Sequence, residues 1–175
     1  MSVKPVSQRH HVQWPTLAWV WQKPHRVLGF GFGSGLLRPG SGTWASLLAL
    51  LLWWPLSQVL DWHWQAVFIV GMLIAGVWIC DRCVNELGVP DHVGIVWDEI
   101  AAVWLVLWAI PPVWWLMLVG FAAFRLFDVT KPQPIQVLDS RVGGGFGVML
   151  DDLLAALYAI ALSWVIWSIA AVLRG

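Results

Sequence analysis

Residues 100–124 read IAAVWLVLWAIPPVWWLMLVGFAAF, an uncharged stretch that is interrupted by Pro111-Pro112. Proline lacks the backbone N–H that a helix needs and disfavours helix in the residue before it. The stretch is therefore either one kinked helix or two short helices that turn at the prolines. As two arms, Ile95–Ile110 and Pro112–Asp128, it would return the chain to the side from which it came.

Charge distinguishes these two folds. In the hairpin, segments 1–43, 81–99 and 125–152 share one side, which then holds nine of the ten basic residues, all but Arg174, and nine of the ten acidic residues, all but Asp61. One kinked span would separate the later basic residues from the basic N-terminal segment. Because basic residues concentrate on the cytoplasmic side of a membrane, the sequence favours the hairpin with a cytoplasmic N-terminus. Its short arms imply local thinning of the bilayer or partial insertion.

The composition is that of a membrane protein. Hydrophobic residues make up 59% of the chain, the mean hydropathy is +0.73, and 16 residues are tryptophan, which favours lipid headgroups. We expect an all-α, polytopic helical membrane protein with about 4–5 membrane-embedded helices. The zero net charge gives no sign of a nucleic-acid partner. The uncharged stretches are Pro39–Leu60, Trp64–Cys80, Ile100–Phe124 and Leu153–Leu173.

The N-terminal residues are expected to form a tail, and the two cysteines are expected to be structural. Residues 1–28 lack the apolar core of a secretory signal and are predicted to be an N-terminal cytoplasmic tail, followed by a single membrane domain over 29–175. Cys80 and Cys83 have no second cysteine pair with which to bind zinc, so we expect buried thiols at a helix end.

A polar, glycine-rich segment, FRLFDVTKPQPIQVLDSRVGGGFGVMLDD, occupies residues 124–152 between two apolar runs. Arg125, Asp128 and Lys131 recur every third residue and fall on one side of a helix end. Pro132 predicts that the helix ends at Lys131 and leaves this lysine free. An ordinary ion-paired helix terminus is the weaker alternative explanation of these three charges. The doublet Asp151-Asp152 then opens the last apolar run, and a helix cap would explain only one of the two acids.

Two further segments precede apolar runs. Residues 31–46, GFGSGLLRPGSGTWAS, combine glycines, which let backbone N–H groups approach an anion, with Arg38, Thr43 and Ser46. The segment lacks the GK[ST] ending of a P-loop, and a flexible lead-in to a helix is an equal alternative. Residues 91–99, DHVGIVWDE, carry Asp98 and Glu99 in the first turn of a helix, where either could serve the helix dipole. A single histidine, His92, is more often structural than a metal ligand or a base.

Together the three segments offer many oxygen ligands beside a few cations. Hard carboxylates with few His or Cys residues suit Mg²⁺, and crowded like charges near lipid need a cation to neutralise them. Phosphoryl chemistry needs charge to clamp the phosphate and a means to activate water, and a metal ion, Arg or Lys side chains and glycine-rich loops meet these needs. With no large soluble domain, the phosphate is expected on a lipid headgroup. The candidate oxygen ligands are Asp91, Asp98, Glu99, Asp128, Asp151 and Asp152, beside Arg38, Arg125 and Lys131.

Four motifs, GFGSGLL…GT..S, DH..IVWDE, FR.FD..KP.PI and GG.G.M.DD, resemble the bacterial phosphatidylglycerophosphatase A family in order and spacing, from Gly29 to about Ala155. The resemblance implies a Mg²⁺-dependent phosphatase that converts phosphatidylglycerophosphate to phosphatidylglycerol and inorganic phosphate. It also implies an all-helical fold in the bacterial inner membrane, with the active site facing the cytoplasm and a phospholipid in the bilayer as substrate.

Carried over position by position, the resemblance implies specific roles. The family usually has proline and glycine where this chain has Ser41 and Ala45, so the first loop matches least well. Attack by water and attack by an aspartate both remain open, as does the oligomeric state. A CDP-alcohol-type phosphotransferase would need a DG..AR…G…D…D pattern that is absent, and a Mg²⁺ transporter would need acids deep within its spans. The implied catalytic and metal residues are Asp98, Glu99, Asp128, Asp151 and Asp152, and the implied phosphate-binding residues are Arg125, Lys131, Thr43 and Arg38.

Overall fold

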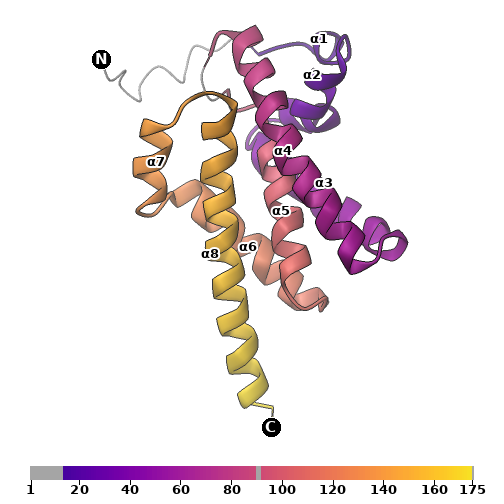
Figure 1. Ribbon diagram of the computed structural model, residues 1–175, viewed down its shortest axis with the longest axis vertical. Coiled ribbons are helices and arrows are strands. Elements are labelled where there is room, and N and C mark those ends of the chain that lie inside the picture. The colour runs from indigo at the N-terminus through magenta and orange to yellow at the C-terminus, as the bar shows by residue number, and fades with distance from the viewer. Residues whose placement is uncertain (1–13, 90–91, 175) are drawn as a thin grey trace.

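The computed structural model describes residues 14–89 and 92–174, with all of their side chains except those of residues 139 and 140. All regular structure in this part of the chain is helical, which confirms the predicted all-α class (Figure 1). The elements are α1 (Leu17–Val20), α2 (Pro24–Gly29), the 3₁₀ helix η2 (Gly31–Leu36), α3 (Ser41–Val59), α4 (Trp62–Leu87), α5 (Trp97–Ala109), α6 (Trp114–Thr130), α7 (Ile135–Arg141) and α8 (Gly144–Val172).

Two of the described helices, α4 and α8, are long and apolar enough to cross a membrane. With 26 and 29 residues they exceed the roughly 20 residues that a bilayer requires. Helix α5 has only 13 residues, and at about 1.5 Å per residue it is too short to cross. The length and composition of these two helices are consistent with a membrane protein, whereas the number of embedded helices stays a prediction.

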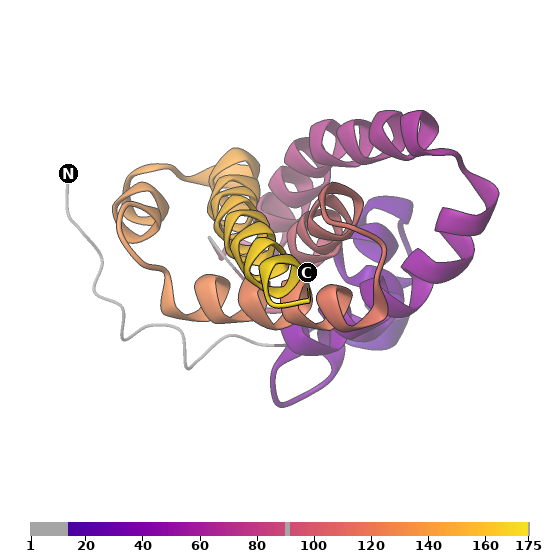
Figure 2. The ribbon, with the colours of Figure 1, turned by 90° about the horizontal axis from the view of Figure 1, so that it is seen from below.

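Helix α5 is the central element of the structure. It packs against α3, α4, α6 and α8, and Figure 2 shows it enclosed between α4, α6 and α8. Nine of its residues are buried, including Asp98 in its first turn. Burial on all sides explains why this helix is apolar around its whole circumference.

The proline pair divides the third apolar stretch as the hairpin predicts. Helix α5 ends at Ala109 and α6 begins at Trp114, so Pro111 and Pro112 lie between them. The end of α6 returns to the start of α5, because Arg125 Nη1 lies 3.8 Å from Glu99 Oε1. The predicted return of the chain at the proline pair is thus confirmed, and the placement of the two helices relative to a membrane stays a prediction.

Two predicted helix bounds were wrong. Helix α4 continues past Cys80 to Leu87, because its charged end folds against the N-terminal helices. Helix α8 begins at Gly144 instead of near Leu153, so the aspartate doublet lies about two turns inside the helix. The reason is tertiary: glycines with low helix propensity are held helical by contact with α4.

Glycine permits the close crossing of α4 and α8. A methyl group at Gly145 would lie 2.1 Å from the Val77 carbonyl oxygen, and one at Gly76 would lie 2.5 Å from Met149 Sδ. Only glycine allows the two helices to approach so closely. Below this crossing α8 and α4 diverge, with α5 between them (Figure 1). The crossing fixes α8, and with it Asp151 and Asp152, relative to α5.

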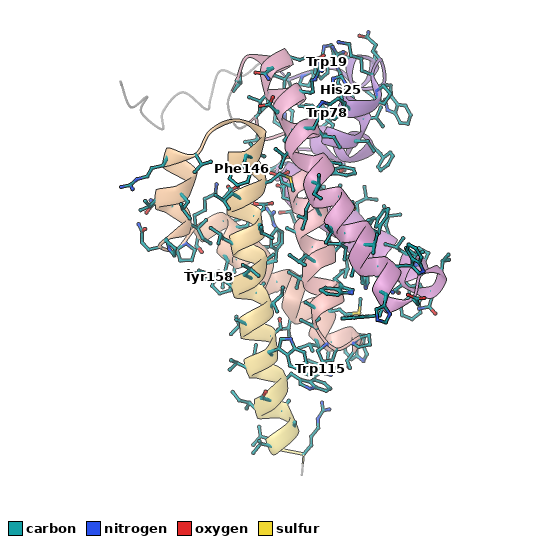
Figure 3. All side chains as sticks on the ribbon, in the orientation of Figure 1. Trp19, His25, Trp78, Trp115, Phe146 and Tyr158 are labelled. Carbon is teal, nitrogen blue, oxygen red and sulfur yellow. The ribbon has the colours of Figure 1, made fainter. Side chains whose placement is uncertain are left out.

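The residues just before the glycine-rich segment pack onto the end of α4. Lys23 Nζ lies 2.7 Å from Glu86 Oε1, and Arg26 Nε lies 2.5 Å from Glu86 Oε2. Figure 3 shows Trp19, His25 and Trp78 gathered at this end of α4. Residues 14–28 therefore form part of the folded structure, whereas residues 1–13 of the predicted tail lie outside the described residues. Cys80 and Cys83 are buried free thiols inside α4.

Candidate active site

Three carboxylates converge where α5, α8 and the end of α6 meet. Asp98 and Glu99 lie in the first turn of α5, and Asp152 lies in α8. One oxygen of each lies within 4.8 Å of the others. The exposed fraction is 8% for Asp98 and 4% for Asp152, so these acids are almost shielded from water. Such a group can hold a metal ion.

Helix capping does not explain the aspartate doublet of α8. The N-cap of α5 is Val96 and that of α8 is Gly143, and neither helix start has a side-chain cap from its own N-cap residue. Asp151 and Asp152 lie seven and eight residues beyond the start of α8, outside the turn in which the helix dipole acts. The alternative explanation, that the doublets serve as caps, therefore fails for α8.

The electrostatics of the cluster favour a bound cation. Burial raises the pKa of Glu99 well above its ordinary value, and the nearby charges of Asp152 and Asp128 raise it further, while Arg125 lowers it. Glu99 Oε2 and Asp152 Oδ2 are buried and accept no hydrogen bond from any described residue. Buried polar atoms normally have partners. A divalent cation would satisfy both oxygens and remove the repulsion.

Arg125 joins the cluster from α6. Its Nη1 lies 2.6 Å from Asp128 Oδ2 and 3.8 Å from Glu99 Oε1, and all three side chains are largely buried. Its Nε is buried without a hydrogen-bond partner in the described part of the chain. Asp128 thus orients a guanidinium group beside the three carboxylates, where it can meet an anionic oxygen.

Lys131 pairs with Asp151, the first aspartate of the doublet. Helix α6 ends at Thr130, one residue before the predicted end, and Lys131 is its C-cap with φ 40° in the left-handed region. The lysine is not free as predicted, because its Nζ forms an ion pair with Asp151. Lys131 is strained in this left-handed conformation, which favours glycine, and such strain is typical of functional sites.

The five predicted acids therefore fall into two groups. Asp98, Glu99 and Asp152 form the cluster, while Asp128 and Asp151 each pair with a cation. Asp91 lies outside the described residues. His92 is structural: it is buried, and its Nδ1 accepts a hydrogen bond from the Gly94 N–H at 2.9 Å.

The glycine-rich segment reaches the site through Gly42, a contact that the motif spacing did not identify. A methyl group at Gly42 would lie 2.0 Å from Glu99 Oε1 and 3.0 Å from Arg125 Nη1. The next residue, Thr43, is exposed. Arg38 is exposed too, and its guanidinium lies 3.8 Å from the centroid of the Trp14 ring. The segment therefore contributes mainly the close approach of its backbone at Gly42 to Glu99 and Arg125. The glycines of residues 31–46 predict such an approach but do not identify which glycine makes it.

Comparisons with known proteins show the family to which the chain is related. The profile of the family described as phosphatidylglycerophosphatase A matches residues 27–167. A phosphatidylglycerophosphatase A of Haemophilus influenzae is 43% identical over 138 residues, which cover 78% of this chain and 85% of the relative. One of Escherichia coli is 37% identical over 144 residues, covering 82% and 83%. A Bacteroides thetaiotaomicron relative with the provisional name phosphatidylinositol-3-phosphatase is 35% identical over 151 residues, covering 80% and 94%.

No solved structure matches the chain. The matched residues include all three cluster carboxylates, Gly42, and the two cations Arg125 and Lys131. The chain belongs to the phosphatidylglycerophosphatase A family.

Proposed function

We propose that this protein is a Mg²⁺-dependent lipid phosphatase that hydrolyses phosphatidylglycerophosphate to phosphatidylglycerol and inorganic phosphate, as a step of phospholipid biosynthesis. The observation that carries the proposal is the buried group of Asp98, Glu99 and Asp152, with Arg125 beside it, in a chain of this family. A phosphatase needs positive charge on the phosphate and an activated nucleophile, and this site can provide both.

The residues present fit a magnesium ion. The three acids offer only hard oxygen ligands, and two of their oxygens are buried without a hydrogen-bond donor in the described part of the chain. Asp98, Glu99 and Asp152 would hold the ion. When bound, it would supply a positive charge for the phosphate and lower the pKa of a water molecule.

The chain's own cations would complete the site. Asp128 holds Arg125 by a short ion pair, so the guanidinium is oriented before substrate arrives. Arg125 would then neutralise charge on the phosphoryl oxygens. Asp151 in the same way holds Lys131 at the end of α6, where it would contact the lipid phosphate. Thr43 and Arg38 lie on the exposed side of the first segment, where they could contact only the outer part of the headgroup.

We place the protein in the bacterial inner membrane as a multi-pass protein whose site faces the cytoplasm. Support comes from the two span-length helices and from the short helices that meet at one end of them. The charge bias of the segments that carry the site supports the cytoplasmic side. On this placement the carboxylates lie near the headgroup level, where a lipid phosphate can reach them.

The test is phosphate release by the purified full-length protein in mixed micelles. Phosphatidylglycerophosphate is expected to release inorganic phosphate, whereas phosphatidylglycerol, which has no phosphomonoester, is expected to release none. Phosphatidylinositol 3-phosphate serves as a third substrate because of the name of one relative. Absence of phosphate release from phosphatidylglycerophosphate would refute the proposed function, and preference for the inositol lipid would change the substrate.

Gly42→Ala is expected to lower phosphate release by about tenfold to a hundredfold, because an added methyl group would displace the Glu99 carboxylate and Arg125. Gly71→Ala is the matched control, since a methyl group there meets nothing within 4 Å. The measurement is kcat for both variants beside their thermal unfolding temperatures. Equal activity of the two variants would show that the approach of α3 to Glu99 is not required.

A further inference from the structure

The start of α8 cannot hold itself in helical form. Its first four residues include three glycines, Gly144, Gly145 and Gly147, and each costs about 1 kcal/mol in a helix relative to alanine. The N-cap residue, Gly143, has no side chain that could bond to the free N–H groups of the first turn. The backbone of Gly144 has φ +71°, so the helix starts directly from a left-handed residue. Some other group must therefore secure this end.

Asp81 on α4 supplies the missing cap. Its Oδ1 accepts a hydrogen bond from the Gly145 N–H at 3.3 Å, across 64 residues of sequence. Its Oδ2 accepts a second hydrogen bond, at 3.0 Å, from Asn85 Nδ2 one turn further along α4, which orients the carboxylate. A negative charge at a helix N-terminus is also favoured by the helix dipole. The contact lies at the crossing where Gly145 touches the backbone of α4.

We infer that Asp81 is a positioning residue for the carboxylate cluster: its cross-helix hydrogen bond to Gly145 fixes the rotation and axial position of α8, and thereby directs Asp152 toward Asp98 and Glu99. Asp152 lies seven residues, or about two turns, after Gly145, so a rotation of the helix start is transmitted directly to it. The inference rests on the proposed function only for its Mg²⁺ readout, since the position of α8 does not depend on a bound metal.

The test compares three full-length variants in detergent micelles with two readouts. Asp81→Leu removes the cap, Asp81→Asn keeps an oxygen acceptor, and Asp61→Leu removes the cap of the opposite end of α4, where Asp61 Oδ1 accepts from the His63 and Trp64 N–H groups. The readouts are the Kd for Mg²⁺ by titration calorimetry and the amide hydrogen exchange of residues 144–152 without metal.

Asp81→Leu is expected to weaken Mg²⁺ binding by about tenfold, as loss of an outer-shell partner does, and to speed exchange in residues 144–152. Asp81→Asn should restore both readouts to within about twofold of the parent. Asp61→Leu should lower the unfolding temperature and leave both readouts unchanged. An Asp81→Leu protein with parental Mg²⁺ affinity, or one that matches Asp61→Leu in both readouts, would overturn the inference.

Asn85→Ala covers the case in which Asp81→Leu does not fold. This variant only frees Asp81 Oδ2, so we expect a smaller change of both readouts in the same direction, and unchanged exchange would overturn the inference. A parent protein that binds no Mg²⁺ or releases no phosphate would contradict the proposed function only. The inference about Asp81 would still be tested by the exchange readout, which needs neither metal nor substrate.

Discussion

Replacing Asp152 with asparagine is expected to abolish phosphate release, with kcat reduced by about a thousandfold or more. Asp152 is one of three carboxylates whose oxygens lie within 4.8 Å of one another, and it is the only member of this group from α8. Its loss would remove a ligand and leave Asp98 and Glu99 on a single helix turn. Two adjacent acids on α5 cannot surround an ion by themselves.

For the same variant we expect a gain in thermal stability in the absence of metal, opposite to the loss of activity. Without metal, three buried carboxylates repel one another, so Asp152→Asn should raise the unfolding temperature in EDTA while it removes activity. A variant that merely damaged the fold would lower both. The measurements are phosphate release and thermal unfolding with EDTA and with Mg²⁺.

Asp61→Asn is the matched control, because Asp61 is an exposed acid at the far end of α4 and asparagine still caps a helix. It should retain parental activity. An Asp152→Asn protein that keeps more than about a tenth of the parental kcat would rule out a catalytic or metal-binding role for this residue.

Removal of divalent cations is expected to have an equally large effect. EDTA should lower phosphate release by about a thousandfold, and Mg²⁺ added in excess should restore it. Ca²⁺ should restore it poorly, because Ca²⁺ needs more ligands and a larger cavity than three clustered carboxylates provide. The physical reason for the loss is that the acids, once uncompensated, would repel the phosphate that they otherwise bind through the cation.

Thermal unfolding separates this explanation from a general effect of chelation. Mg²⁺ should stabilise the parent protein, because a ligand that binds only the folded state raises its stability. It should not stabilise Asp152→Asn, which lacks the ligand set. Full activity after exhaustive treatment with EDTA would show that the cluster works without a metal ion.

Much of the fold could be predicted from local patterns. The break at Pro111-Pro112 follows from the missing N–H of proline, and the helices on either side follow from their uninterrupted apolar runs. The end of α6 at Thr130 follows from the proline after Lys131. Each of these features depends on residues within a few positions of one another, so the sequence contains the whole cause.

The helix bounds that were wrong depend on distant residues. Three glycines before Asp151 argue for a loop on propensity alone, yet they are helical, because Gly145 lies against the backbone of α4 and Asp81 caps the helix. The helix end at Pro132 predicts a free Lys131, and the prediction is wrong because the partner, Asp151, is twenty residues away on another helix. Tertiary contact overrides local preference in both places.

The sequence by itself determined which residues carry charge at the ends of apolar helices, and so which residue types could perform chemistry. Only the tertiary structure decided how those charges divide: Asp98, Glu99 and Asp152 into one buried cluster, and Asp128 and Asp151 into ion pairs with Arg125 and Lys131. Residues 98 and 152 are far apart in sequence. Their distance in space depends on how closely α4, α5 and α8 pack, which is set by glycines and one capping aspartate that no charge pattern singles out.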